Sequence, residues 1–169
     1  PDYAAAQTSL EATRVALTGR PRVEARVAAR TAVLEFLEKT AFPAWTGTPW
    51  DFNGTSTTPG EGKIACGYLV STVLLHAGFK VERVRLAQQA SANIVATLAR
   101  GTPVVRFTPK DNAEALAQIH QRFGDGLFVV GFDYHVGFLR LEGERAEFCH
   151  SSFIEPGSVV CEPPVATGA

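Results

Sequence analysis

The most constraining feature of this sequence is a series of short apolar segments that fills its last third. The segments "GLFVVGF" (126–132), "YHVGFLRL" (134–141) and "RAEFCHSS" (145–152) are rich in β-branched and aromatic residues, and "EGER" forms the turn between the last two. Strands joined by so short a turn pair antiparallel, because a parallel pair needs a long crossover connection. The sequence therefore predicts an antiparallel meander at the end of the chain.

Helical patterns come before these strands. Apolar residues recur at the spacing of an amphipathic helix in four segments, each bounded by Gly or Pro. We predict helices at about 22–40, from Cys66 to Gly78, at about 86–99 and at about 112–123, and a short strand at 102–108. Helices followed by a sheet are typical of the α+β class, with N-terminal helices packed on the meander.

The chain of 169 residues has the size of one globular domain. We expect residues 1–21, which are Ala- and Thr-rich with weak periodicity, to be a loosely ordered leader, and 22–169 to form the single domain. A long loop at 42–63 contains three Pro, four Gly and two Trp. Loops of this length in compact domains are usually functional or disordered, and the aromatic residues argue against disorder.

Charge and hydropathy exclude several classes of partner. Sixteen Lys and Arg stand against seventeen Asp and Glu, giving a net charge of -1, and no segment concentrates charge of one sign. Nucleic acid as a partner is therefore not expected, because such proteins carry a basic surface. No apolar run approaches the length of a membrane span. We expect a monomer without a cofactor. Export is expected as well, although the sequence contains no visible signal peptide.

Cys66 is the first candidate for chemistry, because it lies at the start of a predicted helix. Free backbone N–H groups and the helix dipole favour a thiolate there, whereas a buried structural cysteine would serve only as a small apolar side chain. A nucleophile needs a base, and the chain has four histidines. His76 lies about 15 Å further along the same helix, and His120 is expected at the surface, which leaves His135 and His150.

The turn at 142–145 tests whether these two histidines can meet. If the hairpin pairs Leu141 with Ala146, the same register brings His150 opposite Gly137, which shares a face with His135. The two imidazoles are then diagonal neighbours, and one can orient the other as in a catalytic triad. A register shift of one residue would put them on opposite faces.

The cysteines allow two further interpretations, a metal site and a disulfide. Cys66, His135 and His150, with Cys149 nearby in sequence, offer a set of zinc ligands, although Cys149 must point away from His150 on its strand. Metal binding is the less favoured interpretation, and we predict no metal site. Cys149 and Cys161 can form a disulfide if their segments run side by side in an oxidising compartment, which the sequence leaves open.

The order of these motifs resembles the NlpC/P60 cysteine peptidases, a papain-like family that cuts peptide bonds in bacterial cell walls. The resemblance covers about residues 48–153 and is carried by "IACGYLVSTVLLHAGF", "YHVGFLRL" and "FCHSS". It implies Cys66 as nucleophile, His135 as base and His150 as orienting residue. The family commonly has Asp-Cys-Ser-Gly at the nucleophile, where this chain has Ala-Cys-Gly-Tyr at 65–68.

The resemblance implies a hydrolase that acts on a peptide or a peptidoglycan fragment. The candidates for substrate binding are aromatic, and the first three are expected to form a groove wall: Trp45, Trp50, Phe52 and Tyr68. Two other functions remain open. One is a non-catalytic binding or scaffold module of the same fold, in which Cys66 only packs, and the other is an acyltransferase that uses the same thiol.

Overall fold

The fold was analysed in a computed structural model, which describes residues 2–164. It consists of helices followed by one antiparallel sheet in the strand order β1-β2-β3-β4, so the α+β class is confirmed. The helices are α1 (Tyr3–Ala16), α2 (Arg22–Phe36), the π-helical η1 (Leu37–Ala41), α3 (Phe42–Trp45), α4 (Cys66–His76), α5 (Arg83–Ala87), α6 (Ser91–Ala99) and α7 (Asn112–Phe123). The strands are β1 (Gly126–Gly131), β2 (Val136–Glu142), β3 (Arg145–Ser151) and β4 (Val159–Glu162).

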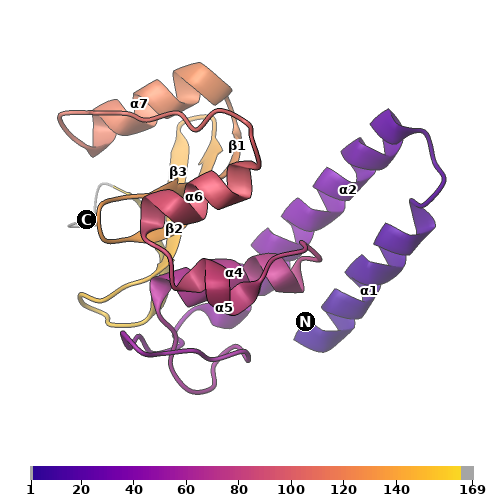
Figure 1. Cartoon of the computed structure of the whole chain (residues 1–169), viewed down its shortest axis with the longest axis horizontal. Coiled ribbons are helices and arrows are strands. Elements are labelled where there is room, and N and C mark those ends of the chain that lie inside the picture. Colours follow the sequence, from indigo (N-terminus) through magenta and orange to yellow (C-terminus); the bar gives the residue numbers. More distant parts are fainter. Residues whose placement is uncertain (1, 165–169) are drawn as a thin grey trace.

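The sheet separates two apolar clusters (Figure 1). On one face Val136 and Phe138 pack with the apolar residues of α4, which include Val70 and Val73. On the other face Leu139 and its neighbours pack with α7. Because side chains of a strand alternate between faces, the α4 cluster and the α7 cluster lie on opposite sides of β2.

The predicted register of the β2–β3 hairpin is confirmed. Leu141 pairs with Ala146, and Phe138 pairs with Cys149 three residues further along the same register. A side chain on Gly137 would have no room, because a Cβ atom there would lie 2.6 Å from Cζ of Phe148. The glycine therefore lets the Phe148 ring lie across β2.

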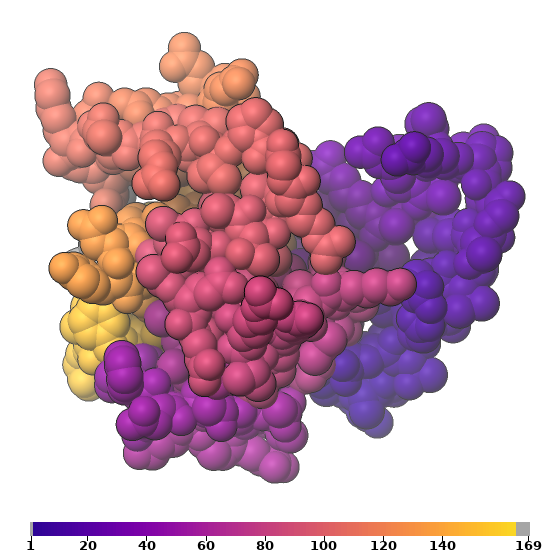
Figure 2. Space-filling view, viewed as in Figure 1, coloured from indigo at the N-terminus to yellow at the C-terminus, as the bar shows by residue number. Residues whose placement is uncertain are grey.

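The first two helices form a hairpin that stands out from one side of the molecule, coloured indigo to purple in Figure 2. The segment expected to be a loosely ordered leader contains the 14-residue helix α1, which the Asp2 carboxylate caps. The hydroxyl of Tyr3 accepts a hydrogen bond from Nε1 of Trp45 and donates one to Nδ1 of His76. These two bonds tie the start of α1 to the core. Within residues 2–164, none of the helices has both the length and the apolar character needed to cross a bilayer.

Three local predictions were wrong, each because of a contact distant in sequence or a change of helix type. The helix predicted at 22–40 continues to Trp45: a π-helical turn precedes α3, and Pro43 lies in the first turn of α3, where its missing N–H costs little. The helix predicted at 86–99 is two helices, and the Ser91 hydroxyl at the start of α6 donates a hydrogen bond to the Phe132 carbonyl oxygen. Residues 102–108 form no strand, and β1 is the edge of the sheet on that side.

Candidate active site

Cys66 is the first residue of α4, as the sequence predicts. The N-cap residue Ala65 has no side chain that could accept a hydrogen bond, so the first backbone N–H groups of the helix face the Cys66 side chain without competition from a cap. The loop before it is held by a hydrogen bond from the Ala65 N–H to the Gly54 carbonyl oxygen, 2.9 Å long. Gly67 is buried and lies so close to the Ala87 carbonyl oxygen that a larger residue would not fit. Both contacts fix the position of the cysteine at the helix start.

His135 and His150 form a direct hydrogen bond. Nε2 of His135 lies 2.7 Å from Nδ1 of His150, and both side chains are buried. Nε2 of His150 lies 3.1 Å from Oε1 of Glu162 on β4. Three side chains from β4, β3 and the residue before β2 thus form one chain of hydrogen bonds. The predicted meeting of the two imidazoles is confirmed.

The nitrogen at the His135 end of this hydrogen-bond chain has no partner. Nδ1 of His135 is buried, and it is the one buried side-chain nitrogen or oxygen among the described residues without a hydrogen bond. A buried polar atom without a partner costs free energy, so such atoms are rare and often functional. The aromatic rings of Phe148, at 6.0 Å between centroids, and Phe153, at 5.7 Å, hold the His135 ring edge to face.

Burial raises the pKa of the Cys66 thiol, contrary to the expectation of a stabilised thiolate. Backbone N–H groups of Val136, Gly67 and Cys66 itself donate to the sulfur and lower the pKa, as a helix start should, but desolvation is the larger effect. Val136 is the residue that follows His135, so the sulfur lies against the backbone directly beside the residue that carries the imidazole. The resting site therefore contains a neutral thiol.

Burial and, secondly, the neighbouring His150 lower the pKa of His135 to about 4. Burial also lowers the pKa of His150, while its hydrogen bond and attraction to Glu162 act in the opposite direction. At neutral pH both imidazoles are consequently uncharged, and so is the thiol, so the resting site contains no thiolate–imidazolium ion pair.

The aromatic residues predicted to bind substrate lie in four different environments. Trp45 is fully buried, so it belongs to the core and not to a groove wall. Trp50 is half-buried and contacts Phe153, which itself contacts the His135 ring. Phe52 is 79% exposed on its loop, away from these ring contacts. Tyr68 is half-buried, and its hydroxyl accepts a hydrogen bond from the Gln88 amide.

Two residues of the site were not predicted from the sequence. Glu162 was not identified because the short strand β4 follows a stretch with no clear alternation. Phe153 was not identified because it lies in the turn after β3, outside any predicted strand. The one available signal for Glu162 was its position next to Cys161. If these cysteines pair, Glu162 must lie near the strand that carries His150.

Cys149 and Cys161 form a disulfide between β3 and β4, leaving Cys66 as the free cysteine. Within residues 2–164, the predicted catalytic residues do not group as metal ligands. The one such group of three consists of Glu147 and the two disulfide sulfurs. Because sulfurs in a disulfide are poor ligands, the described geometry gives no support to the zinc alternative.

The site thus places a free thiol at a helix start, at the backbone N–H of Val136, and the preceding residue, His135, is a buried base with one unpartnered nitrogen. Such an arrangement can do nucleophilic chemistry on a carbonyl group. A scan of known protein families and searches of curated proteins and of solved structures find no match to this chain.

Proposed function

We propose that this chain is a papain-like cysteine hydrolase of the NlpC/P60 type, with Cys66, His135 and His150 as its catalytic residues. The observation that carries the proposal is the unpartnered Nδ1 of His135. Its Nε2 is engaged with His150, so Nδ1 is the atom available to take a proton. The sulfur of Cys66 lies at the backbone N–H of the next residue, Val136.

In the first step, Sγ of Cys66 attacks the carbonyl carbon of an amide while its proton passes to Nδ1 of His135. The thiol and the imidazole must come within hydrogen-bond distance when substrate binds, as catalytic hydrogen bonds often do. The C–N bond then breaks, the proton moves from His135 to the leaving nitrogen, and a thioester remains on the sulfur. His150 keeps the His135 ring oriented throughout, in the role of the third member of a triad.

The negative charge of the tetrahedral intermediate develops on the former carbonyl oxygen, bonded to the carbon that the sulfur attacks, and three backbone N–H groups lie beside the sulfur to receive it. Those of Cys66 and Gly67 belong to the uncapped start of α4, and that of Val136 comes from β2. Fixed donors of this kind are worth about 2.7–4 kcal/mol each in transition-state stabilisation in other acyl-transfer enzymes. Water then attacks the thioester with His135 as base, which releases a carboxylic acid and restores the thiol.

The substrate that fits this proposal is a peptide bond of a bacterial cell-wall stem peptide. The disulfide supports an exported protein, because disulfides persist in oxidising compartments. Trp50 and Phe153, which continue from the His135 ring toward the surface, are the candidates for contacting the substrate. The chain is taken to act as a monomer.

One observation favours a second candidate, the non-catalytic module. Burial raises the pKa of the Cys66 thiol, which is also expected of a cysteine that only packs. The two functions differ in whether His135 acts on the sulfur.

Alkylation of the free thiol by iodoacetamide separates them. The other two cysteines are bonded to each other, so the oxidised protein should take up one label per chain, and a Cys66→Ala variant should take up none. If His135 accepts the proton as the thiol reacts, the rate should stay nearly constant from pH 7 down to about pH 5. It should fall only as His135 itself becomes protonated, near pH 4. A thiol without a base should instead lose about tenfold in rate per pH unit below its pKa.

The His135→Gln variant completes this experiment. It should remove the plateau and leave the tenfold fall per pH unit, whereas a His120→Gln variant at the exposed surface should keep the plateau. If wild type and His135→Gln have the same rate at every pH, His135 is not a base and the catalytic proposal is refuted. Incubation with soluble muropeptides, followed by mass spectrometry, then tests for a new amine and acid that depend on Cys66.

A further inference from the structure

Glu162 occupies the end of the hydrogen-bond chain opposite to His135 and lies one residue from a disulfide. We propose that Glu162 is a positioning residue that sets the tautomers of both histidines, and that the Cys149–Cys161 disulfide keeps it there, so that reduction of this bond lowers activity. The inference rests on the proposed function for its effect on activity. Its structural part, the tautomers, is measurable without any substrate.

The tautomers follow from what each atom can donate. An ionised carboxylate only accepts, so Nε2 of His150 must carry the hydrogen that Oε1 of Glu162 receives. Nδ1 of the neutral His150 is then an acceptor, and the hydrogen between the two rings must belong to Nε2 of His135. This leaves Nδ1 of the neutral His135 as a bare lone pair. Glu162 therefore selects the one tautomer in which His135 can act as a base toward Cys66.

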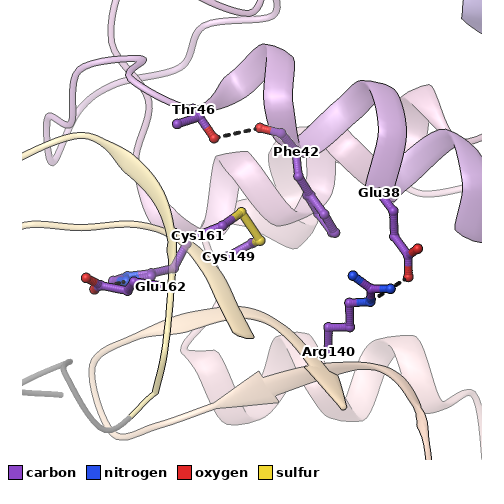
Figure 3. Close-up of a disulfide and its surroundings, with 8 residues drawn as sticks. Glu38, Phe42, Thr46, Arg140, Cys149, Cys161 and Glu162 are labelled. Carbon is purple, nitrogen blue, oxygen red and sulfur yellow. Dashed lines mark hydrogen bonds and ion pairs between the residues drawn. A yellow bond between two sulfur atoms is a disulfide. The ribbon is translucent and has the colours of Figure 1, made fainter. Parts of the chain in front are cut away.

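The disulfide joins the two strands that carry this contact. Cys149 precedes His150 on β3, Cys161 precedes Glu162 on β4, and the two cysteines face each other in the register of the pair. The disulfide lies on one face of the sheet, and Glu162 points away from it (Figure 3). Alternation along both strands brings His150 and Glu162 together on the opposite face. The bond thus fixes the distance between the strands directly beside the hydrogen bond.

The two ends of β4 are held differently. At its start, Val159 exchanges backbone hydrogen bonds with Gly47 and Thr48, each 2.8 Å long. Beyond its end, the Asn112 amide donates to the Pro164 carbonyl oxygen. Between these anchors, the disulfide links β4 covalently to β3. Glu162 is the last residue of the four-residue strand, directly after the disulfide cysteine. Reduction should therefore loosen this end of β4 and leave the fold intact.

The disulfide is open to a reductant from one side. Cys161 is half-buried and lines a cavity of about 190 Å³, together with residues of η1, of α3 and its C-cap, and of the sheet. Figure 3 shows four of them around the sulfurs: Glu38, Phe42, Thr46 and Arg140. A dithiol reductant can attack Sγ of Cys161, with Cys149 leaving as thiolate, and its second thiol then releases Cys161. Two protein thiols form, and the reductant becomes the disulfide.

Nitrogen NMR of protein labelled with ¹⁵N-histidine measures the tautomers directly. In the oxidised wild type at pH 7, both Nε2 atoms of His135 and His150 should be protonated and both Nδ1 atoms bare. A Glu162→Gln variant replaces the acceptor by an amide that can also donate, so it should give mixed or reversed tautomers. Glu147→Gln is the matched control, because Glu147 lies on the disulfide face and should change neither ring. Reduction of the wild type with dithiothreitol should resemble Glu162→Gln.

Kinetics on the muropeptide substrate give the second readout. Glu162→Gln and reduction should each lower kcat by about 10- to 100-fold, the cost typical of losing a partner that orients a metal-bound histidine, with KM little changed. Reduction should have no further effect on Glu162→Gln, because both changes act through the same contact. Reoxidation of the wild type should restore kcat.

The outcomes separate this inference from the proposed function. If turnover depends on Cys66 but neither Glu162→Gln nor reduction alters the tautomers or kcat, the inference is wrong and the hydrolase stands. If the oxidised wild type has a protonated Nδ1 on His135, the tautomer argument is overturned. If no turnover depends on Cys66 while the tautomers respond to Glu162→Gln, the proposed function fails and Glu162 remains a structural determinant of the two rings.

Discussion

Acidification should destabilise this protein through His135 in particular. The unfolded chain binds a proton at the ordinary histidine pKa of 6.5, whereas the native site holds the pKa of His135 at about 4. Between these two values the unfolded state binds more protons, so the free energy of unfolding falls as the pH falls. The difference between 6.5 and about 4, at 1.36 kcal/mol per pKa unit, is worth about 3 kcal/mol. About 2 kcal/mol of this loss should occur between pH 7 and pH 5.

Urea unfolding of the wild type and of His135→Gln at pH 7 and pH 5 measures the contribution of His135 to the loss of unfolding free energy in acid. Carboxyl groups also lose favourable contacts in acid, but they are common to both proteins and cancel in the comparison. The wild type should therefore lose about 2 kcal/mol more than the variant over this interval. His120→Gln, at an exposed position, is the control and should lose as much as the wild type. Equal losses in the wild type and His135→Gln would refute the view that His135 is buried in its neutral form.

Two substitutions test the packing around the site. Tyr3→Phe removes the hydroxyl between Trp45 and His76 and leaves the buried indole N–H without an acceptor, so it should cost about 1–3 kcal/mol of unfolding free energy in urea. An unchanged value would mean that α1 is not part of the folded core. Gly67→Ala forces a methyl group against the Ala87 carbonyl oxygen and should cost about 1–3 kcal/mol, with slower alkylation of the free thiol. A variant as stable as wild type would contradict this close contact.

The parts of the fold that depend on local pattern could be predicted. The α4 helix with its stop at Gly78, the α7 helix capped by Asp111, and the β2–β3 register all follow from short-range signals. The register was decisive, because it is the reason that His135 and His150 lie on one face. A turn of even length and alternating side chains are sufficient to predict that meeting.

The remaining parts depend on contacts that a single sequence does not reveal. Trp45 lies in a Pro- and Gly-rich segment, where an aromatic side chain suggests a groove wall. The hydroxyl of Tyr3, 42 residues earlier in the chain, instead accepts a hydrogen bond from the indole N–H, which allows the side chain to be fully buried. Apart from its place next to Cys161, nothing in the sequence distinguishes Glu162 from the other acidic residues, because its contact with His150 depends on the pairing of β4 with β3. The pKa of Cys66 depends on a balance of burial against backbone donors, and only the folded chain sets that balance.

The close packing of Gly137 and Phe148 restricts which residues the two positions can hold together. The Phe148 ring occupies the space that a side chain at 137 would need, and it stacks on the His150 ring with 4.7 Å between centroids. A larger residue at 137 would therefore displace the ring that supports His150. Neither position can change freely without the other, so in homologous sequences the two should covary. A side chain at 137 would need a smaller residue at 148 and also a shift of the Cys149 carbonyl oxygen, which lies 2.9 Å from the same Cβ position.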